Sequence, residues 1–155
     1  MPVKFQVEPW ATALPELRPL FRMLWDDVAV DKDRFVAECD EDKYAACDSL
    51  GMLHLVTARS DKELVGYFLM LVQPNPHYKG QGLMSYTDMF YMKPEFRRGN
   101  AGLKLFSFME ETLKAKGVVK MYSSHKVHRD RSAMFKVLGW KPVDLVYSKV
   151  LEAEN

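Results

Sequence analysis

Apolar residues recur at helical spacing along two stretches of the chain. In residues 14–28 they follow each other at steps of three and four, as on the buried face of an amphipathic helix. Pro15 suits the first turn of this helix, whereas Pro19 should kink it or delay its start. Gly99 to Lys116 is the clearest helix of the chain, and Gly117 ends it. Its apolar stripe consists of Leu105, Phe106, Met109 and Leu113.

Six shorter segments predict strands, because β-branched and aromatic residues fill them and turn residues bound them. They are Lys4–Glu8, Met52–Arg59, Glu63–Val72, Leu83–Met92, Val118–Ser123 and Val143–Leu151. Ser60 to Lys62 predicts a turn between the second and third segments, and Gln73 to Gly82 predicts a longer loop before the fourth.

Two further helices complete the pattern. The acidic stretch from Asp31 to Leu50 predicts one helix or two short ones, ending at Gly51. Arg131 to Leu138 predicts a last short helix. The elements therefore follow the order β α(α) β β β α β α β, which predicts one mixed α/β domain over residues 1–155.

Charge is distributed unevenly along the chain although its totals nearly cancel. The 155 residues carry 22 basic and 21 acidic side chains, for a net charge of +1, which argues against a general nucleic-acid coat. Residues 26–48 hold nine acidic and three basic residues, a net charge of −6. Residues 93–136 hold eleven basic and four acidic residues, a net charge of +7. Near-neutrality here conceals two opposed patches.

Several classes of protein are not expected. No apolar run reaches the roughly 18–20 residues that span a bilayer, and the first residues lack the layout of a secretory signal, so we expect a cytoplasmic protein without a membrane partner. Cys39 and Cys47 form neither a redox pair nor a zinc site. His125 and His128 lack the third and fourth ligands that a metal would need, so no metal is expected.

The segment from Asp88 to Leu103 carries the most chemical information. A predicted strand ends in a short, basic, glycine-containing loop that opens directly into a helix. Such a loop directs backbone N–H groups and the positive end of a helix dipole at one point, and Arg97 and Arg98 add formal charge. This pattern suits a pyrophosphate. The spacing alone is equally compatible with a basic helix start that binds nothing.

At these residues the sequence resembles the GNAT superfamily, the GCN5-related N-acetyltransferases. Residues 97–102, Arg-Arg-Gly-Asn-Ala-Gly, fit the family's pyrophosphate loop, [Q/R]-x-x-G-x-[G/A], with Asn100 in place of its central glycine. Asn tolerates a left-handed backbone, which would preserve the loop. Residues 88–97 resemble the family's strand E-D-L-Y-V-x-P-x-Y-R, and residues 133–140 resemble its helix A-x-x-Y-x-x-x-G-F. Asp88 together with the pair His77-Tyr78 is similar to the small GNATs of tailed bacteriophages.

The resemblance implies a central, mixed, mostly antiparallel twisted sheet of six to seven strands, with about four helices and with strands 4 and 5 splayed apart. Acetyl-CoA would enter between those two strands as cosubstrate. The backbone of Phe90 to Met92 would pair with its pantetheine arm, an N–H near Met92 would polarise the thioester, and the loop would hold its pyrophosphate. The implied cofactor-binding residues are Phe90, Tyr91, Met92, Arg97, Arg98, Gly99, Asn100, Ala101, Gly102, Leu103 and Phe135.

The implied reaction is direct transfer of an acetyl group to a primary amine, either a small cationic amine or a protein lysine or N-terminus. Asp88 stands where many GNATs place a Glu base, and its shorter reach favours a water relay; the alternative is a structural carboxylate that bonds a loop backbone. Phe135 stands where the family often has a Tyr that protonates the leaving thiolate. Solvent would supply that proton, or one of Ser132, Tyr122 and Tyr147.

The acceptor side is the least determined part of the chain. His77, Tyr78 and His125 are candidates to line it, while the segment around His77 is equally typical of a plain turn. The acidic residues between positions 26 and 48 would attract a cationic acceptor or form a solvated helix face. A homodimer is possible. The alternative to an enzyme is a GNAT-fold protein that is weakly active or inactive and binds CoA or another protein.

Overall fold

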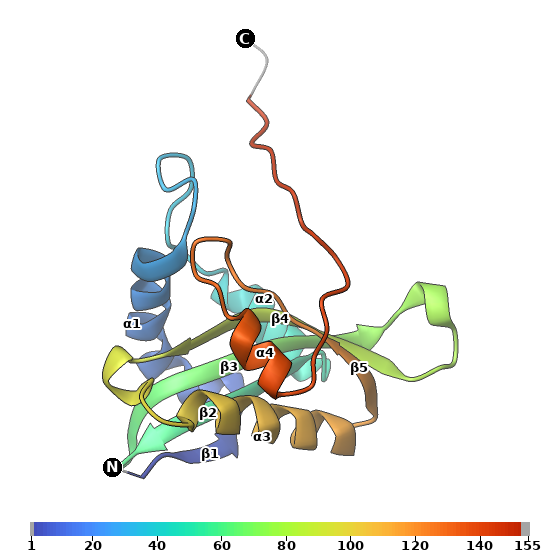
Figure 1. The fold of residues 1–155 in the computed structure, drawn as a ribbon, viewed down its shortest axis with the longest axis horizontal. Coiled ribbons are helices and arrows are strands. Elements are labelled where there is room, and N and C mark those ends of the chain that lie inside the picture. The colour runs from blue at the N-terminus through green and yellow to red at the C-terminus, as the bar shows by residue number, and fades with distance from the viewer. Residues whose placement is uncertain (1, 153–155) are drawn as a thin grey trace.

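Five strands form one sheet in the computed structural model, which describes residues 2–152 (Figure 1). The strands lie in the order in which they occur along the chain, and only the last pair, β4 and β5, is parallel. They are β1 (Lys4–Val7), β2 (Leu53–Ser60), β3 (Glu63–Pro74), β4 (Leu83–Met92) and β5 (Val118–Tyr122).

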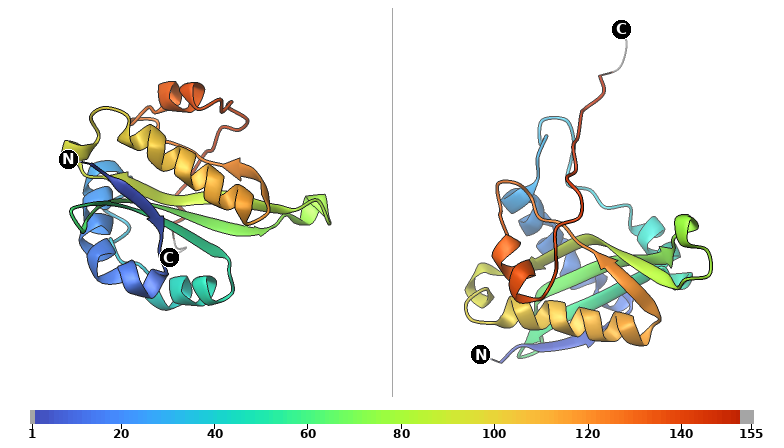
Figure 2. Two further views of the ribbon diagram at one scale, coloured as in Figure 1. Left: turned by 90° about the horizontal axis from the view of Figure 1, so that it is seen from below. Right: turned by 45° about the vertical axis from the view of Figure 1, so that its right-hand side comes forward.

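Helices cover both faces of the sheet (Figure 2). On one face, α1 (Trp10–Val28) and α2 (Glu41–Ser49) enclose a core that contains Leu17 and Tyr67. On the other face, α3 (Ala101–Ala115) and α4 (Ser132–Val137) cover a second core. The predicted stripe of α3 is confirmed, since Leu105, Phe106, Met109 and Leu113 are all buried there.

The first helix starts earlier than the sequence predicts. It begins at Trp10 and continues through Pro15 and Pro19, so Pro19 does not delay its start. A proline in a helix removes one hydrogen bond, but buried side chains lie on both sides of the prolines. Trp10 and Leu20 are both buried against the sheet, and this packing holds the two halves in one helix. The acidic stretch is helical only from Glu41, after Asp40 accepts a capping bond from the Lys43 N–H at 3.1 Å.

The predicted last strand is wrong. Residues 143–151 form no strand, and the sheet has five strands among residues 2–152 rather than six to seven. Residues 143–151 run away from the domain beyond α4 (Figure 1). A strand exists only when its backbone pairs with a neighbour, and within the described chain this segment has none.

The expected splay of the fourth and fifth strands is confirmed. Residues Leu83 to Tyr86 pair with β5, and β4 then continues to Met92 paired with β3 but not with β5. The side chains of Thr87 and Ser123 make a last contact at 2.8 Å, beyond which the two strands diverge. A β-bulge falls at the same point, because Leu69 pairs with Met89 while the next residue of β3 pairs with Thr87. Asp88 is the extra residue of this bulge.

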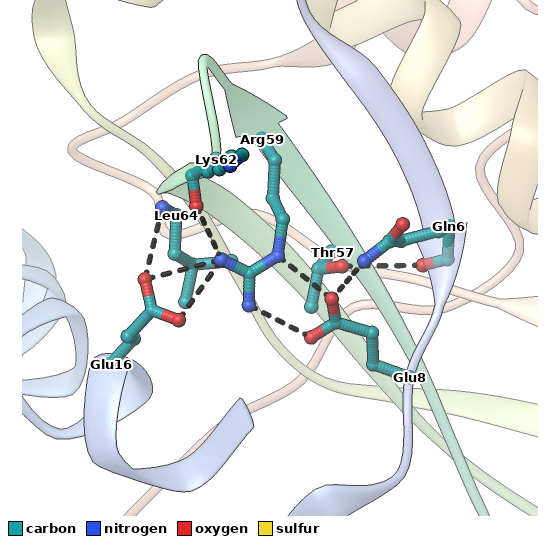
Figure 3. A network of polar contacts seen from close by, with 7 residues as sticks. All are labelled: Gln6, Glu8, Glu16, Thr57, Arg59, Lys62 and Leu64. Atoms are coloured by element: carbon teal, nitrogen blue, oxygen red, sulfur yellow. Dashed lines mark hydrogen bonds and ion pairs between the residues drawn. The ribbon is translucent and has the colours of Figure 1, made fainter. Parts of the chain in front are cut away.

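A hydrogen-bonded ion pair fastens the start of the chain to the β2–β3 hairpin (Figure 3). The guanidinium of Arg59 donates to the two carboxylate oxygens of Glu8 at 2.7 and 3.1 Å and to Glu16 of α1 at 2.9 Å. Glu8 is only 8% exposed. Hydrogen bonds from Arg59 hold the pKa of Glu8 below its ordinary value.

We expect Arg59→Met to lower the free energy of unfolding by about 3 kcal/mol, because it leaves a nearly buried carboxylate unpaired. Urea unfolding at pH 7 measures this change. The control Arg22→Met removes an exposed pair with Asp26 and should change the free energy by less than about 0.5 kcal/mol. The lowered pKa of Glu8 stabilises the native state above the ordinary glutamate value of 4.5. The effect of Arg59→Met should therefore shrink as the pH falls below that value; an undiminished effect in acid would contradict the ion-pair origin.

Candidate functional site

A cavity of about 1430 Å³ opens where β4 and β5 separate. Its floor is the free end of β4, residues 87–92. Its walls come from the C-terminal half of α1, the loop before α2, the start of α3 and the segment that follows β5. Five residues that the sequence predicted as cofactor-binding line this cavity: Phe90, Tyr91, Met92, Arg97 and Gly102. The predicted base Asp88 and the acceptor-side candidate His125 line it as well.

The backbone of β4 points into the gap that β5 leaves. The Lys93 N–H donates to the Val65 carbonyl at 2.8 Å, so Met92 and Gly66 form a pair without direct hydrogen bonds. The N–H and C=O of Met92, and of Phe90 two residues earlier, are therefore directed away from β3. The Met92 carbonyl accepts from Arg97, which leaves the N–H groups of Phe90 and Met92 and the Phe90 carbonyl facing the gap.

Two of the three guanidinium nitrogens of Arg97 hold the loop together. Its Nε donates to the Met92 carbonyl at 2.7 Å, and its Nη2 lies 3.2 Å from Asp27 Oδ2 at the end of α1. The guanidinium also lies 5.1 Å from the centre of the Tyr91 ring. Asp27 further pairs with Arg129 in the segment after β5 at 2.5 Å. One carboxylate thus ties both sides of the splay to α1, and Arg97 holds the loop in place while it also lines the cavity.

The loop before α3 keeps its turn without a central glycine. Gly99 has the left-handed backbone, with φ of 78°, whereas Asn100 has φ of −112°. Asn100 does not need the left-handed conformation that an asparagine tolerates, and the substitution at this position introduces no strain. Asn100 makes no side-chain capping bond, so the first N–H groups of α3 have no cap from it.

Gly102 leaves open space beside these N–H groups. A Cβ atom built there would meet no atom within 4 Å, and the residue lines the cavity. The fold therefore does not require a glycine at this helical position. The other predicted loop residues, Arg98, Gly99, Asn100, Ala101 and Leu103, lie on the loop and first turn of α3 without lining the cavity.

Asp88 makes a short hydrogen bond that the sequence did not reveal. Its carboxylate, exposed to the cavity, accepts from the Tyr44 hydroxyl of α2 at 2.6 Å. Tyr44 is fixed in turn by stacking on Trp10, with ring centres 4.7 Å apart. The surrounding protein raises the pKa of Asp88 by desolvation, and the bond from Tyr44 lowers it. Desolvation raises the pKa of Tyr44, so its hydroxyl stays a neutral donor. Tyr44 lies on α2 and Asp88 on β4, 44 positions apart in the sequence. No sequence motif connects residues at that separation, which is why the sequence did not predict the pair.

The remaining candidates lie in different places. His125 lines the cavity, and its ring stacks on Phe135 with centres 6.2 Å apart. Phe135 also packs against Phe106 of the core, and it does not line the cavity. His77 and Tyr78 belong to the 3-10 turn η1 (Pro76–Tyr78) at the tip of the β3–β4 hairpin, which projects away from the other elements (Figure 1). The structure does not bring these two residues to the cavity.

The two charge patches of the sequence meet around the cavity. Acidic residues reach it from the loop before α2 and from the first turn of that helix: Glu38, Asp40, Glu41 and Asp42. Basic residues reach it from the segment after β5: Lys126, Arg129 and Arg131. Asp40 is paired with Lys43 and Glu41 with Arg18, which reduces the negative charge of the first group. Residues 2–152 contain no cluster of three metal-ligating side chains. None of their helices is long and apolar enough to cross a membrane.

A sequence model of the acetyltransferase (GNAT) family matches residues 14–140. The chain belongs to the GNAT acetyltransferase family. It is therefore an acyltransferase by family. A search of curated protein sequences finds no match.

Solved structures of GNAT acetyltransferases share the fold of the whole chain. The aminoglycoside N-acetyltransferase AAC(6')-Iy, solved with a CoA bisubstrate analogue, is 16% identical, with coverage of 99% and 100% of the two chains and a TM-score of 0.72. A ribosomal-protein-alanine N-acetyltransferase from Brucella melitensis biovar Abortus 2308 is 15% identical, with coverage of 98% and 100% and a TM-score of 0.72. Glucosamine-6-phosphate N-acetyltransferase from Arabidopsis thaliana is 12% identical, with coverage of 98% and 100% and a TM-score of 0.72. At these identities the likeness establishes the fold alone.

We expect Tyr44→Phe to raise the pKa of Asp88, because the ring remains while the hydrogen bond that favours the ionised carboxylate is lost. Titration of the Asp88 carboxyl carbon by NMR measures the change. As a control, Tyr86→Phe removes a hydroxyl that accepts from Asn75 and should leave the pKa of Asp88 unchanged. An unchanged or lowered pKa in Tyr44→Phe would show that the bond does not stabilise the ionised form.

Proposed function

We propose that the chain transfers an acetyl group from acetyl-CoA directly to a primary amine. One observation carries this proposal: the backbone of Phe90 and Met92 faces the gap between β4 and β5, and that gap leads to the start of α3. A linear amide-containing arm can pair with such a backbone as an additional strand does. The arm would lie on β4 in the place that β5 leaves vacant beyond Tyr86.

The start of α3 fits the pyrophosphate of the same cosubstrate. The N–H groups of its first turn lack a side-chain cap, and their positive dipole favours an anion. The open space at Gly102 lets a phosphate approach the backbone closely. Since Arg97 is held by Met92 and Asp27, we propose that Arg98 and the basic segment after β5 supply the formal charge.

Asp88 is proposed to receive the proton that the amine loses. The nitrogen of the amine attacks the thioester carbon, a C–N bond forms and the C–S bond breaks, while the proton passes to Asp88 directly or through a water. A carboxylate with a raised pKa is a stronger base, and the bond from Tyr44 keeps it ionised and aimed from the bulge. The N–H of Met92 would stabilise the negative charge on the thioester oxygen.

The proton for the departing thiolate is proposed to come from solvent. Phe135 carries no proton to donate, and it packs into the core against Phe106 and Trp140. The cavity has a volume of about 1430 Å³, which admits solvent, and a CoA thiol is acidic enough to leave without a dedicated side-chain acid.

A small cationic amine is the proposed acceptor, with a lysine side chain or an N-terminus of a protein as the other candidate. The acidic residues from Glu38 to Asp42 line the cavity beside Asp88 and would attract a positive charge. Proteins with the same fold include aminoglycoside acetyltransferases, one of them solved with sisomicin, and aminoglycosides are polycationic amines. His125 lines the same cavity and remains an acceptor-side candidate, whereas His77 and Tyr78 do not enter this proposal.

Cofactor binding separates the enzyme from a GNAT-fold interaction module. We expect isothermal titration to show saturable binding of acetyl-CoA, and Gly102→Leu to abolish it by filling the space beside the first turn of α3. The same variant should be as stable as the wild type or up to about 1 kcal/mol more stable, because leucine favours a helix over glycine. Ser107→Ala, on the exposed face of α3, should gain stability while binding normally. Absence of wild-type binding at millimolar acetyl-CoA would overturn the proposal.

Substitution of the proposed base tests the chemistry. We expect Asp88→Asn to lower turnover about 100-fold or more in a thiol-release assay with a panel of amines, while folding and acetyl-CoA affinity persist. In the wild type, the rate should fall as the pH drops through the pKa of Asp88. Tyr44→Phe should move this acidic limb to higher pH, since it raises that pKa. Loss of folding in Asp88→Asn would instead indicate a structural carboxylate, and binding without turnover in the wild type would favour an inactive module.

Two broader predictions accompany this function. A cytoplasmic location agrees with an acetyl-CoA-dependent reaction and remains a proposal, as does the likeness to GNATs of tailed bacteriophages. The homodimer is likewise a proposal.

A further inference from the structure

One carboxylate contacts two arginines at the wall of the cavity. Oδ2 of Asp27 lies 3.2 Å from Nη2 of Arg97, and its Oδ1 lies 2.5 Å from Nη2 of Arg129. All three residues line the cavity, and the Asp27 side chain is only 21% exposed. Asp27 thus engages one nitrogen of each guanidinium. Among residues 2–152, the Nη1 and Nε of Arg129 have no hydrogen-bond partner.

Arg129 belongs to a segment with few contacts to the sheet and to α1. Residues 123–131, called the connecting segment below, join β5 to α4 and contain no helix or strand (Figure 1). Within the described chain, two of its side chains hydrogen-bond to the sheet or to α1. Ser123 does so at the start of the segment, with Thr87 at 2.8 Å, and Arg129 does so near its end, with Asp27. The position of Arg129 at the cavity therefore depends on Asp27.

The charge of Asp27 also keeps the two arginines together. Guanidinium groups stay charged at neutral pH, and two of them repel each other when both lie near one point. The carboxylate between Arg97 and Arg129 offsets this repulsion. Without its charge, Arg97 would remain bonded to the Met92 carbonyl, whereas the side chain of Arg129, which is 46% exposed, would be free to turn into solvent. Asp27 thus keeps a second positive charge beside the cavity.

We infer that Asp27 is a positioning residue for acetyl-CoA, which acts by holding Arg129 where its free nitrogens bind a phosphate of this cosubstrate. A guanidinium presents five N–H donors, and Asp27 engages only the Nη2 of Arg129. Gly102, in the first turn of α3, lines the same cavity. The inference rests on the proposed binding of acetyl-CoA and extends it to a residue outside the loop before α3.

The positioning role predicts an effect opposite in sign to that of the charge of Asp27 alone. A carboxylate repels a phosphate, so removing its charge would strengthen the binding of a polyanion if Asp27 acted only through that charge. A positioning residue has the opposite effect, because its loss releases Arg129 and weakens binding. A substitution that removes the charge and keeps the size of the side chain therefore separates the two roles.

Isothermal titration with acetyl-CoA tests this role. Asp27→Asn should weaken binding about tenfold, because a charge-assisted hydrogen bond to a phosphate is lost. The control Asp26→Asn removes the same charge from the neighbouring residue, which pairs with Arg22 and does not line the cavity, and it should bind acetyl-CoA at least as tightly as the wild type. Binding by Asp27→Asn that equals or exceeds that of the wild type would overturn this inference alone. Absence of wild-type binding would overturn the proposed function, and this inference with it.

A second variant keeps the inference testable if Asp27→Asn fails to fold. Arg129→Met, in the exposed connecting segment, should also weaken binding about tenfold, while the pair of Asp27 with Arg97 stays in place. Normal binding of acetyl-CoA by Arg129→Met would overturn the inference.

The two substitutions combined show whether Asp27 acts through Arg129. Asp27→Asn should weaken binding less in the Arg129→Met background than in the wild type, because the two residues act as one unit. Equal effects in both backgrounds would contradict the positioning role. In a turnover assay, Asp27→Asn should raise KM for acetyl-CoA and retain kcat, since Asp88 is unchanged; a lower kcat with an unchanged KM would also contradict it.

Discussion

The separation of β4 from β5 after Tyr86 is the constraint on which the site depends. While the strands are paired, their backbone groups satisfy each other; beyond that point the backbone of Phe90 and Met92 faces open space. The bulge at Asp88 occurs at the same place and turns a charged side chain out of the ladder. A cavity with backbone hydrogen-bonding groups on its floor and a carboxylate beside them follows from this one divergence.

The opened sheet is held by contacts from outside it. Asp27, at the end of α1, pairs with Arg97 on the loop after β4 and with Arg129 on the segment after β5. Each of these segments follows one of the diverging strands, so a single carboxylate fixes the spacing between them. Arg97 thus fixes the geometry of the loop before α3, and the first turn of α3 beside Gly102 has no side-chain cap from Asn100 and has open space around it.

Much of the fold was predictable because its signals are local. The stripe of α3 and the boundaries of β2 to β5 follow from the spacing of apolar residues and from turn residues, and the structure places them within a few positions. The failures have a common cause. Pro19 remains in a helix because residues on both sides of it are buried, and residues 143–151 form no strand because they pair with no strand of the described chain. Neither fact is encoded in the neighbouring residues.

The sequence by itself determined the order of the elements as far as α4, the glycine-containing loop that opens α3 and the division of charge into an acidic and a basic half. Each of these depends on residues within one or two turns of each other, where backbone preference and periodicity act. Only the tertiary structure decided that Tyr44 holds Asp88, that Asp27 takes up Arg97, and that His77 lies far from the cavity. Those outcomes depend on contacts between residues separated by more than forty positions, or on their absence, and the folded chain alone sets such distances.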